Sequence, residues 1–299
     1  MIPATMCTVR SELLDCIQSN LALLADCWHG PETHLVAGAT LRFQPRPGAQ
    51  GLPTVEPAMP GQLAEACDHL GLRVARRWSG LSVARLRRLC ERHGTLYAIG
   101  DSHGMSWLPY HRRRHMDHSF LVSSVDGASE VTDAYHNQTE WGPADPGRWR
   151  LRWAELPAAS LVLHLEPAPT GPTAVAPSIA VEPPEDYLNA YARHPDRTTA
   201  LSRLTVETWL LARSRGLHAA YRARPGSVDQ RTTDHLRRWN QVASQAFLAM
   251  RRLRRGKPEP NNLLPAIATV IADDQEIFGG RSPTTEGVPP RWTPSTSTC

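Results

Sequence analysis

The stretch His118-Ser-Phe-Leu-Val-Ser-Ser-Val-Asp-Gly-Ala-Ser-Glu-Val-Thr-Asp133 decides the fold expected for this chain. Two short runs rich in apolar and β-branched residues flank the dipeptide Asp126-Gly127. An Asp-Gly pair between such runs is a strong signal for a two-residue hairpin turn, because both residues tolerate a positive φ. The stretch therefore predicts an antiparallel hairpin, in which His118 and Asp133 face each other at the open end as cross-strand neighbours.

The segments on either side of this hairpin alternate between strand-like and helical patterns. Further strands are expected at 95–100, 151–155 and 161–165. Apolar residues at helical spacing indicate helices at 13–28, 62–70 and 83–92. A stretch rich in Pro and Gly, 43–61, is expected to form a long surface loop.

A second Pro-rich stretch, 167–184, divides the chain, because it favours extended geometry over helix or core. Beyond it four helices are expected, at 185–193, 198–215, 228–255 and 261–274. The expected class is thus α+β. Its parts are a mixed α+β domain over 1–166, a linker over 167–184, a helical region over 185–280 and a disordered tail over 281–299.

Cys16 is the best-placed nucleophile among the six cysteines. It follows Asp15, a good helix N-cap residue, and opens the first helical pattern. A cysteine in the first turn of a helix lies at the positive end of the helix dipole, which favours the nucleophilic thiolate. The more ordinary interpretation is a small buried apolar residue on a helix.

His118 and Asp133 supply the partners that such a nucleophile needs. A carboxylate beside an imidazole holds the ring in place while the second ring nitrogen reaches the thiol. Taken singly, His118 has a simpler interpretation as a core or surface histidine, and Asp133 as a turn residue that ends a strand. The combination with Cys16 is more informative than any of the three alone.

Several short motifs, in their order along the chain, resemble those of a known family. They are Leu14-Asp-Cys-Ile-Gln-Ser19, Tyr97-Ala-Ile-Gly-Asp101, Trp107-Leu-Pro-Tyr110, His115-Met-Asp-His-Ser-Phe-Leu-Val122 and Val131-Thr-Asp133. The region around 16–133 resembles the butirosin-biosynthesis H-type acyltransferases, which have a papain-like cysteine fold. It resembles the bacteriocin leader peptidases more remotely.

This resemblance implies a papain-like domain with a Cys-His-Asp triad. Cys16 would be the nucleophile, His118 the base and acid, and Asp133 the residue that orients the ring. The family takes an acyl group from a carrier-protein thioester and passes it to an amine or hydroxyl of a small-molecule acceptor in natural-product biosynthesis. It implies no cofactor and no metal.

Four more residues are candidates for contact with the substrate. No glutamine precedes Cys16 where papain-like peptidases have their oxyanion donor, so the sequence leaves Gln18 and the Cys16 N–H for that role. Asp101 ends a strand and is expected near the cleft, where it would bind an acceptor amine. Tyr110 and Tyr135 complete the set.

Other functions fit parts of the same pattern. Attack by water or by an internal nucleophile would make the protein a hydrolase, peptidase or thioesterase, or a cyclase, and the same fold could serve as a non-catalytic binding module. Gly100-Asp-Ser-His-Gly104 resembles one element of calcineurin-type metallophosphoesterases, but the other elements are missing. His111, His115 and His118 have metal-like spacing, although the run Arg112-Arg-Arg114 disfavours a dication.

Composition limits the partners. The chain has 299 residues, a net charge of +4 and six cysteines without a C-x-x-C pair. With no apolar signal segment or membrane span, these features predict a cytoplasmic protein that binds neither membrane nor nucleic acid. One basic cluster remains, at Arg251, Arg252, Arg254 and Arg255. It either complements the dipole at a helix end or docks an acidic carrier protein.

Overall fold

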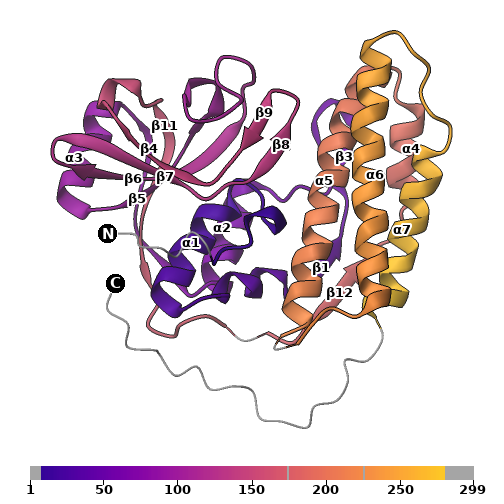
Figure 1. Cartoon of the computed structure of the whole chain (residues 1–299), viewed down its shortest axis with the longest axis horizontal. Coiled ribbons are helices and arrows are strands. Elements are labelled where there is room, and N and C mark those ends of the chain that lie inside the picture. Colours follow the sequence, from indigo (N-terminus) through magenta and orange to yellow (C-terminus); the bar gives the residue numbers. More distant parts are fainter. Residues whose placement is uncertain (1–7, 174, 225, 280–299) are drawn as a thin grey trace. The chain divides into compact units, whose positions relative to one another are not determined.

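The computed structural model describes residues 8–173, 175–224 and 226–279, and the chain divides into two compact units. The first unit contains residues 8–36 and 60–173. The second contains residues 37–59 and the described residues from 175 onward. Helices and strands occur in both (Figure 1), so the expected α+β class is confirmed.

The first unit is built on a six-stranded sheet in which all neighbouring strands are antiparallel. In spatial order the strands are β10 (Gly147–Leu151), β7 (Ala128–Asp133), β6 (Asp117–Val125), β5 (Leu96–Asp101), β11 (Ala159–Pro167) and β4 (Leu72–Leu81). The helices of this unit are α1 (Gln18–His29), α2 (Met59–His69) and α3 (Val83–His93). Helices α1 and α3 pack against β6 and β11. A short hairpin of β8 (Asn137–Thr139) and β9 (Gly142–Ala144) follows β7.

The hairpin predicted from Asp126-Gly127 is confirmed. Val125 pairs with Ala128, and the two turn residues have φ values of 48° and 79°. Positive φ at both central positions is the geometry of a type I′ turn, whose twist matches that of the flanking strands. Four of the predicted helices, at 62–70, 83–92, 185–193 and 228–255, lie within three residues of the observed bounds.

Two parts of the sheet differ from the prediction. The strand expected at 151–155 is wrong, because β10 ends at Leu151 and Trp153–Glu155 forms a short 3-10 turn capped by the Glu155 carboxylate on the Arg152 N–H. Strand β4 was not predicted, because its sequence is rich in arginine. It lies at the edge of the sheet and is largely exposed, and charged side chains on an edge strand discourage pairing with other chains.

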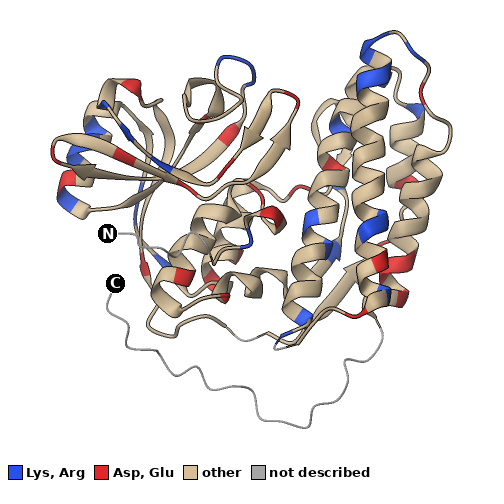
Figure 2. Ribbon diagram, viewed as in Figure 1, with Lys and Arg blue, Asp and Glu red and all other residues tan. Residues whose placement is uncertain are grey.

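The second unit is mainly helical, with an apolar core that includes Trp239, Leu201 and Ile267. Its helices are α4 (Glu185–Arg193), α5 (Arg197–Arg222), α6 (Gln230–Arg254) and α7 (Leu263–Phe278). The C-terminal end of α6 carries most of the basic cluster found in the sequence (Figure 2). Among the described residues, none of these or the other helices combines the length and the apolar character that crossing a bilayer requires.

The domain boundaries differ from the expected contiguous division. Residues 37–59 belong to the second unit, where Phe43 and Leu52 are buried in the helical core, so most of the expected 43–61 surface loop is in fact structured. Strand β1 (Thr40–Phe43) pairs in parallel with β12 (Ser178–Val181), which lies inside the expected linker. A small hairpin of β2 (Arg46–Pro47) and β3 (Pro53–Thr54) follows β1. The tail expected over 281–299 lies outside the described residues.

A buried ionic cluster joins α5, α6 and α7 in the helical unit. Asp274 accepts hydrogen bonds from Arg215 at 2.5 and 2.9 Å, from His235 at 2.8 Å and from Trp239 at 3.0 Å. Burial by itself raises the pKa of the Asp274 carboxyl, but Arg215 and the other donors outweigh it, so the pKa lies below its ordinary value. The charge is therefore compensated where an unpaired one would be costly.

His218 on α5 gives this unit a predicted sensitivity to acid. Its Nδ1 lies 2.8 Å from the Gly38 carbonyl, and burial, reinforced by Arg222 and Arg215, lowers the pKa of His218 to about 4. In the unfolded chain His218 is protonated near pH 6.5, whereas in the folded chain it stays neutral down to about pH 4. Stability is therefore lost as the pH falls from about 6.5 to 4. We expect the free energy of unfolding to fall by roughly 2–3 kcal/mol from this group between pH 7 and 4.5.

The measurement is urea unfolding at several pH values for the parent and for His218→Gln, which keeps an N–H donor but does not titrate. The variant should show a flatter dependence over this interval. Equal slopes for the two proteins would contradict the assignment.

Candidate functional site

Cys16 lies in the turn that leads into α1. The Asp15 carboxylate accepts hydrogen bonds from the backbone N–H groups of Ile17 and Gln18, both at 2.8 Å, and the Asp15 carbonyl accepts from Ser19 at 3.0 Å. The expected helix start at residue 13 is wrong, because α1 begins at Gln18 with Ile17 as its N-cap residue, and Cys16 lies just before the first turn. Asp15 nevertheless accepts from the N–H groups at the start of the helix, as a cap residue does. Cys16 is half-buried in the turn at the positive end of the helix.

The cap around Asp15 is reciprocal and is reinforced from a second helix. Gln18 Oε1 accepts the Asp15 N–H at 3.3 Å, which completes a capping box. Gln62 on α2 donates from Nε2 to Asp15 Oδ2 at 2.6 Å. The contact seen for Gln18 therefore serves the cap, and its role as an oxyanion donor remains a prediction.

His118 and Asp133 form a buried pair. They are 0% and 2% exposed, and His118 Nε2 lies 2.7 Å from Asp133 Oδ2. The pair is not directly opposite in the ladder as expected. Leu121 pairs with Thr132, and continuing that register puts Asp133 beside Phe120, so the contact with His118 is diagonal.

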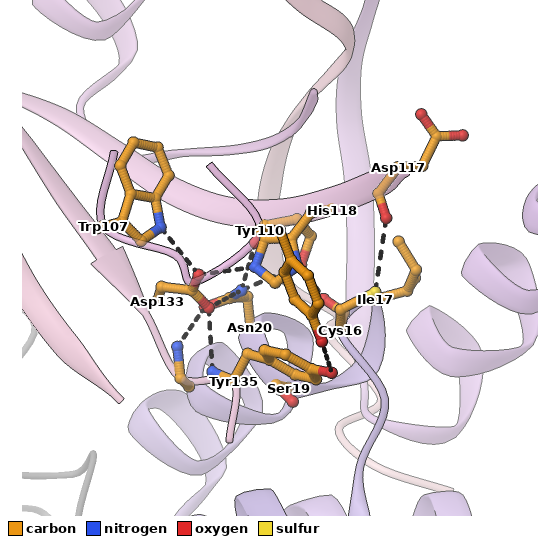
Figure 3. A network of polar contacts seen from close by, with 12 residues as sticks. Cys16, Ile17, Ser19, Asn20, Trp107, Tyr110, Asp117, His118, Asp133 and Tyr135 are labelled. Atoms are coloured by element: carbon orange, nitrogen blue, oxygen red, sulfur yellow. Dashed lines mark hydrogen bonds and ion pairs between the residues drawn. The ribbon is translucent and has the colours of Figure 1, made fainter. Parts of the chain in front are cut away.

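The second nitrogen of the ring has no hydrogen-bond partner in the described part of the chain, and the Cys16 thiol lies against the strand that carries the ring. Within the described residues, His118 Nδ1 is buried and has no hydrogen-bond partner. The Cys16 thiol is 3.6 Å from the carbonyl oxygen of Asp117, the residue that precedes His118 on β6. In the view of Figure 3, Asp133 and Cys16 lie to either side of the His118 ring.

Two further side chains fix the Asp133 carboxylate, and sequence reasoning missed both. Trp107 donates from Nε1 to Oδ2 at 3.1 Å, and Asn20 donates from Nδ2 to Oδ1 at 3.3 Å (Figure 3). The backbone N–H of Tyr135 adds a third contact, at 3.0 Å. With His118, four hydrogen-bond contacts thus hold the carboxylate in place.

The two candidate tyrosines lie beside this pair. The ring of Tyr135 meets that of His118 edge-on, with centroids 5.1 Å apart. Its hydroxyl is 3.3 Å from that of Tyr110, which also accepts from Asn137 at 3.1 Å. Both tyrosines are buried; Tyr135 packs against His118, and Tyr110 is linked to it through the Tyr135 hydroxyl. Their contact with a substrate remains a prediction.

Asp101 lies at the end of β5, where it pairs with Asp117. Its carboxylate is exposed and contacts His115 Nδ1 at 2.5 Å and the His103 N–H at 3.0 Å, while the rings of His103 and His115 stack. Partial desolvation raises the pKa of Asp101, but the hydrogen bonds from His103 and His115 outweigh it and lower the pKa overall. In the part of the chain that the structure describes, no three His, Cys, Asp or Glu side chains are arranged to hold a metal ion.

The structure thus joins His118 to Asp133 directly and packs Tyr135 against the ring. It does not join Cys16 to His118 by a hydrogen bond: the thiol contacts the Asp117 carbonyl, and His118 Nδ1 has no hydrogen-bond partner among the described residues. Comparison of the sequence with protein-family models finds no match, and comparison with curated proteins finds none either. The interpretation of the site accordingly depends on its contacts.

Replacement of Asp15 by Ala should weaken the start of α1. Loss of a helix cap costs about 0.5–2 kcal/mol, whereas Asn keeps the acceptor oxygen. We therefore expect Asp15→Ala to lower the free energy of unfolding in urea by about that amount and Asp15→Asn to lower it by only a few tenths. An Ala variant as stable as the parent would show that the cap does not support the helix.

The cysteines should differ in their reactivity. Burial raises the pKa of Cys67 to about 11 and that of Cys90 to about 12, so both stay as neutral thiols near neutral pH. We expect iodoacetamide at pH 7.5 to alkylate Cys16 more than about tenfold faster than either. Peptide mapping after short exposure measures this, with half-buried Cys27 as the internal reference. Equal labelling of Cys16 and Cys67 would contradict it.

Proposed function

We propose that the protein is a cysteine-dependent acyltransferase with a papain-like catalytic unit. The observation that carries this proposal is the state of His118. One ring nitrogen is held by Asp133 at 2.7 Å, and the other is buried without a hydrogen-bond partner among the described residues, on the strand that Cys16 touches. A general base that serves a thiol needs this division of its two nitrogens.

The reaction follows from these three groups. The Cys16 thiolate attacks the carbonyl carbon of an acyl thioester, and the tetrahedral intermediate collapses with loss of the carrier thiol, which takes a proton from the His118 imidazolium. The acyl group is then a thioester of Cys16. An amine or hydroxyl acceptor attacks it while His118 removes the acceptor's proton, and the Cys16 sulfur leaves. Because one thioester replaces another, the free-energy change of the first step is close to zero. Much of the rate acceleration then comes from the orientation of the reacting groups.

Other outcomes share the first step. Water in place of the acceptor gives a thioesterase or peptidase, and an internal nucleophile gives a cyclase. A non-catalytic binding module would use none of this chemistry.

The donor we propose is an acyl- or peptidyl-carrier protein. Arg251, Arg252, Arg254 and Arg255 lie at the end of α6 and in the residue that follows it, and an acidic helical carrier has the complementary charge (Figure 2). Arg251 lies over the Phe247 ring at 5.6 Å, which holds part of this surface in place. Exposed Asp101 is the group we propose to bind an amine of a small-molecule acceptor.

The test uses a short acyl thioester of N-acetylcysteamine and intact-mass spectrometry. The parent should gain the mass of one acyl group, and peptide mapping should place it on Cys16. Cys16→Ala should gain none, and His118→Ala should react more than about a hundredfold more slowly, in line with the loss of a general base. Cys27→Ala is the matched control and should react like the parent. Equal acylation of Cys16→Ala and the parent would refute the proposal.

A further inference from the structure

Asn20 joins the helix that follows Cys16 to both strands of the His118–Asp133 pair. It is completely buried on α1, four residues after Cys16 and so about one helical turn away. Its Nδ2 lies 3.3 Å from Asp133 Oδ1 and 3.0 Å from both the carbonyl and the hydroxyl oxygen of Ser119. Its Oδ1 accepts the Ala134 N–H at 3.0 Å.

Ser119 completes the connection back to the nucleophile. Its hydroxyl accepts from Asn20 and donates to the carbonyl oxygen of Cys16 at 2.5 Å. A chain of hydrogen bonds therefore runs from the backbone of Cys16 through Ser119 and Asn20 to Asp133, and from there to His118.

We propose that Asn20 is a positioning residue that holds the Asp133 carboxylate in the orientation in which it grips His118. The inference rests on the proposed function, since it assigns Asn20 a role only if Cys16 is activated by His118. An amide suits this place because it offers a donor to the carboxylate and an acceptor to the N–H of the next residue. The two hydrogens of Nδ2 are shared among three acceptors, of which the Asp133 carboxylate is one.

Asn20→Asp separates this role from a purely structural one. The substitution keeps the size and the acceptor for Ala134, but it sets a second carboxyl against Asp133. A like charge and burial raise the pKa of such a carboxyl, so it holds a proton at low pH and can still donate. Above that pKa both groups are ionised and repel each other.

The measurement is the rate of Cys16 alkylation by iodoacetamide from pH 5 to 9, with the adduct located by peptide mapping. We expect Asn20→Asp to react like the parent at low pH and on the order of tenfold or more slowly at high pH, as for loss of a hydrogen bond to a charged group. Asn20→Ala, which cannot donate at any pH, should be slowed by a similar factor throughout. The pH at which the alkylation rate of the Asp variant falls below that of the parent gives the pKa of the introduced carboxyl.

Two controls keep the outcomes distinct. Ser129→Ala removes a hydrogen bond made by another buried residue of the same unit, from Ser129 to the Leu151 carbonyl, and should follow the pH profile of the parent. If the whole protein is alkylated as fast in Cys16→Ala as in the parent, Cys16 is not the most reactive cysteine and the proposed function itself fails. If Cys16 reacts selectively but Asn20→Asp and the parent have parallel profiles, only the role of Asn20 is overturned. If Asn20→Ala does not fold, the pH profile of Asn20→Asp alone still tests the role of Asn20.

Discussion

The buried carboxylate of Asp133 is the constraint on which the rest of the site depends. A charge removed from water is costly unless donors surround it, and here His118, Trp107, Asn20 and the Tyr135 N–H do so. Each donor comes from a different part of the first unit. Hydrogen bonding of the Asp133 carboxylate therefore requires a strand, a loop and a helix to lie next to one another. The helix is α1, which Cys16 precedes.

The same helix places the sulfur. Asp15 and Gln18 cap its start from within, and Gln62 supports the cap from α2. Asn20, one turn later, attaches it to the strands. The position of Cys16 is thus defined at both ends of a single turn, which is the kind of support that a group held for reaction requires. The fold and the candidate chemistry share one set of hydrogen bonds.

Sequence reasoning reached the parts of this arrangement that local signals encode. The Asp126-Gly127 turn fixed the hairpin, and Asp15 before an apolar run indicated the side chain that caps the helix. Trp107 and Asn20 were missed because their partner Asp133 lies 26 and 113 residues away, and nothing in their own neighbourhoods marks them as donors to a carboxylate.

The organisation of the chain was predictable to a similar extent. The helices of the second unit follow from their periodicity, but the membership of residues 37–59 in that unit does not. Phe43 and Leu52 are apolar residues among prolines and glycines, and only the tertiary structure shows in which core they are buried. Strand β4 was missed for a related reason, because an edge strand needs few apolar residues and its arginines conceal the alternation.

The most direct measurement is the separation of Cys16 Sγ and His118 Nδ1 in a crystal structure of the unmodified protein at high resolution. We predict that no other group separates the two atoms, so that rotation of the Cys16 side chain from the Asp117 carbonyl brings the thiol onto Nδ1, with His118 Nε2 still on Asp133. A structure in which Nδ1 packs against apolar atoms while the sulfur is turned away and walled off from solvent would contradict the assignment of Cys16 as a nucleophile activated by His118.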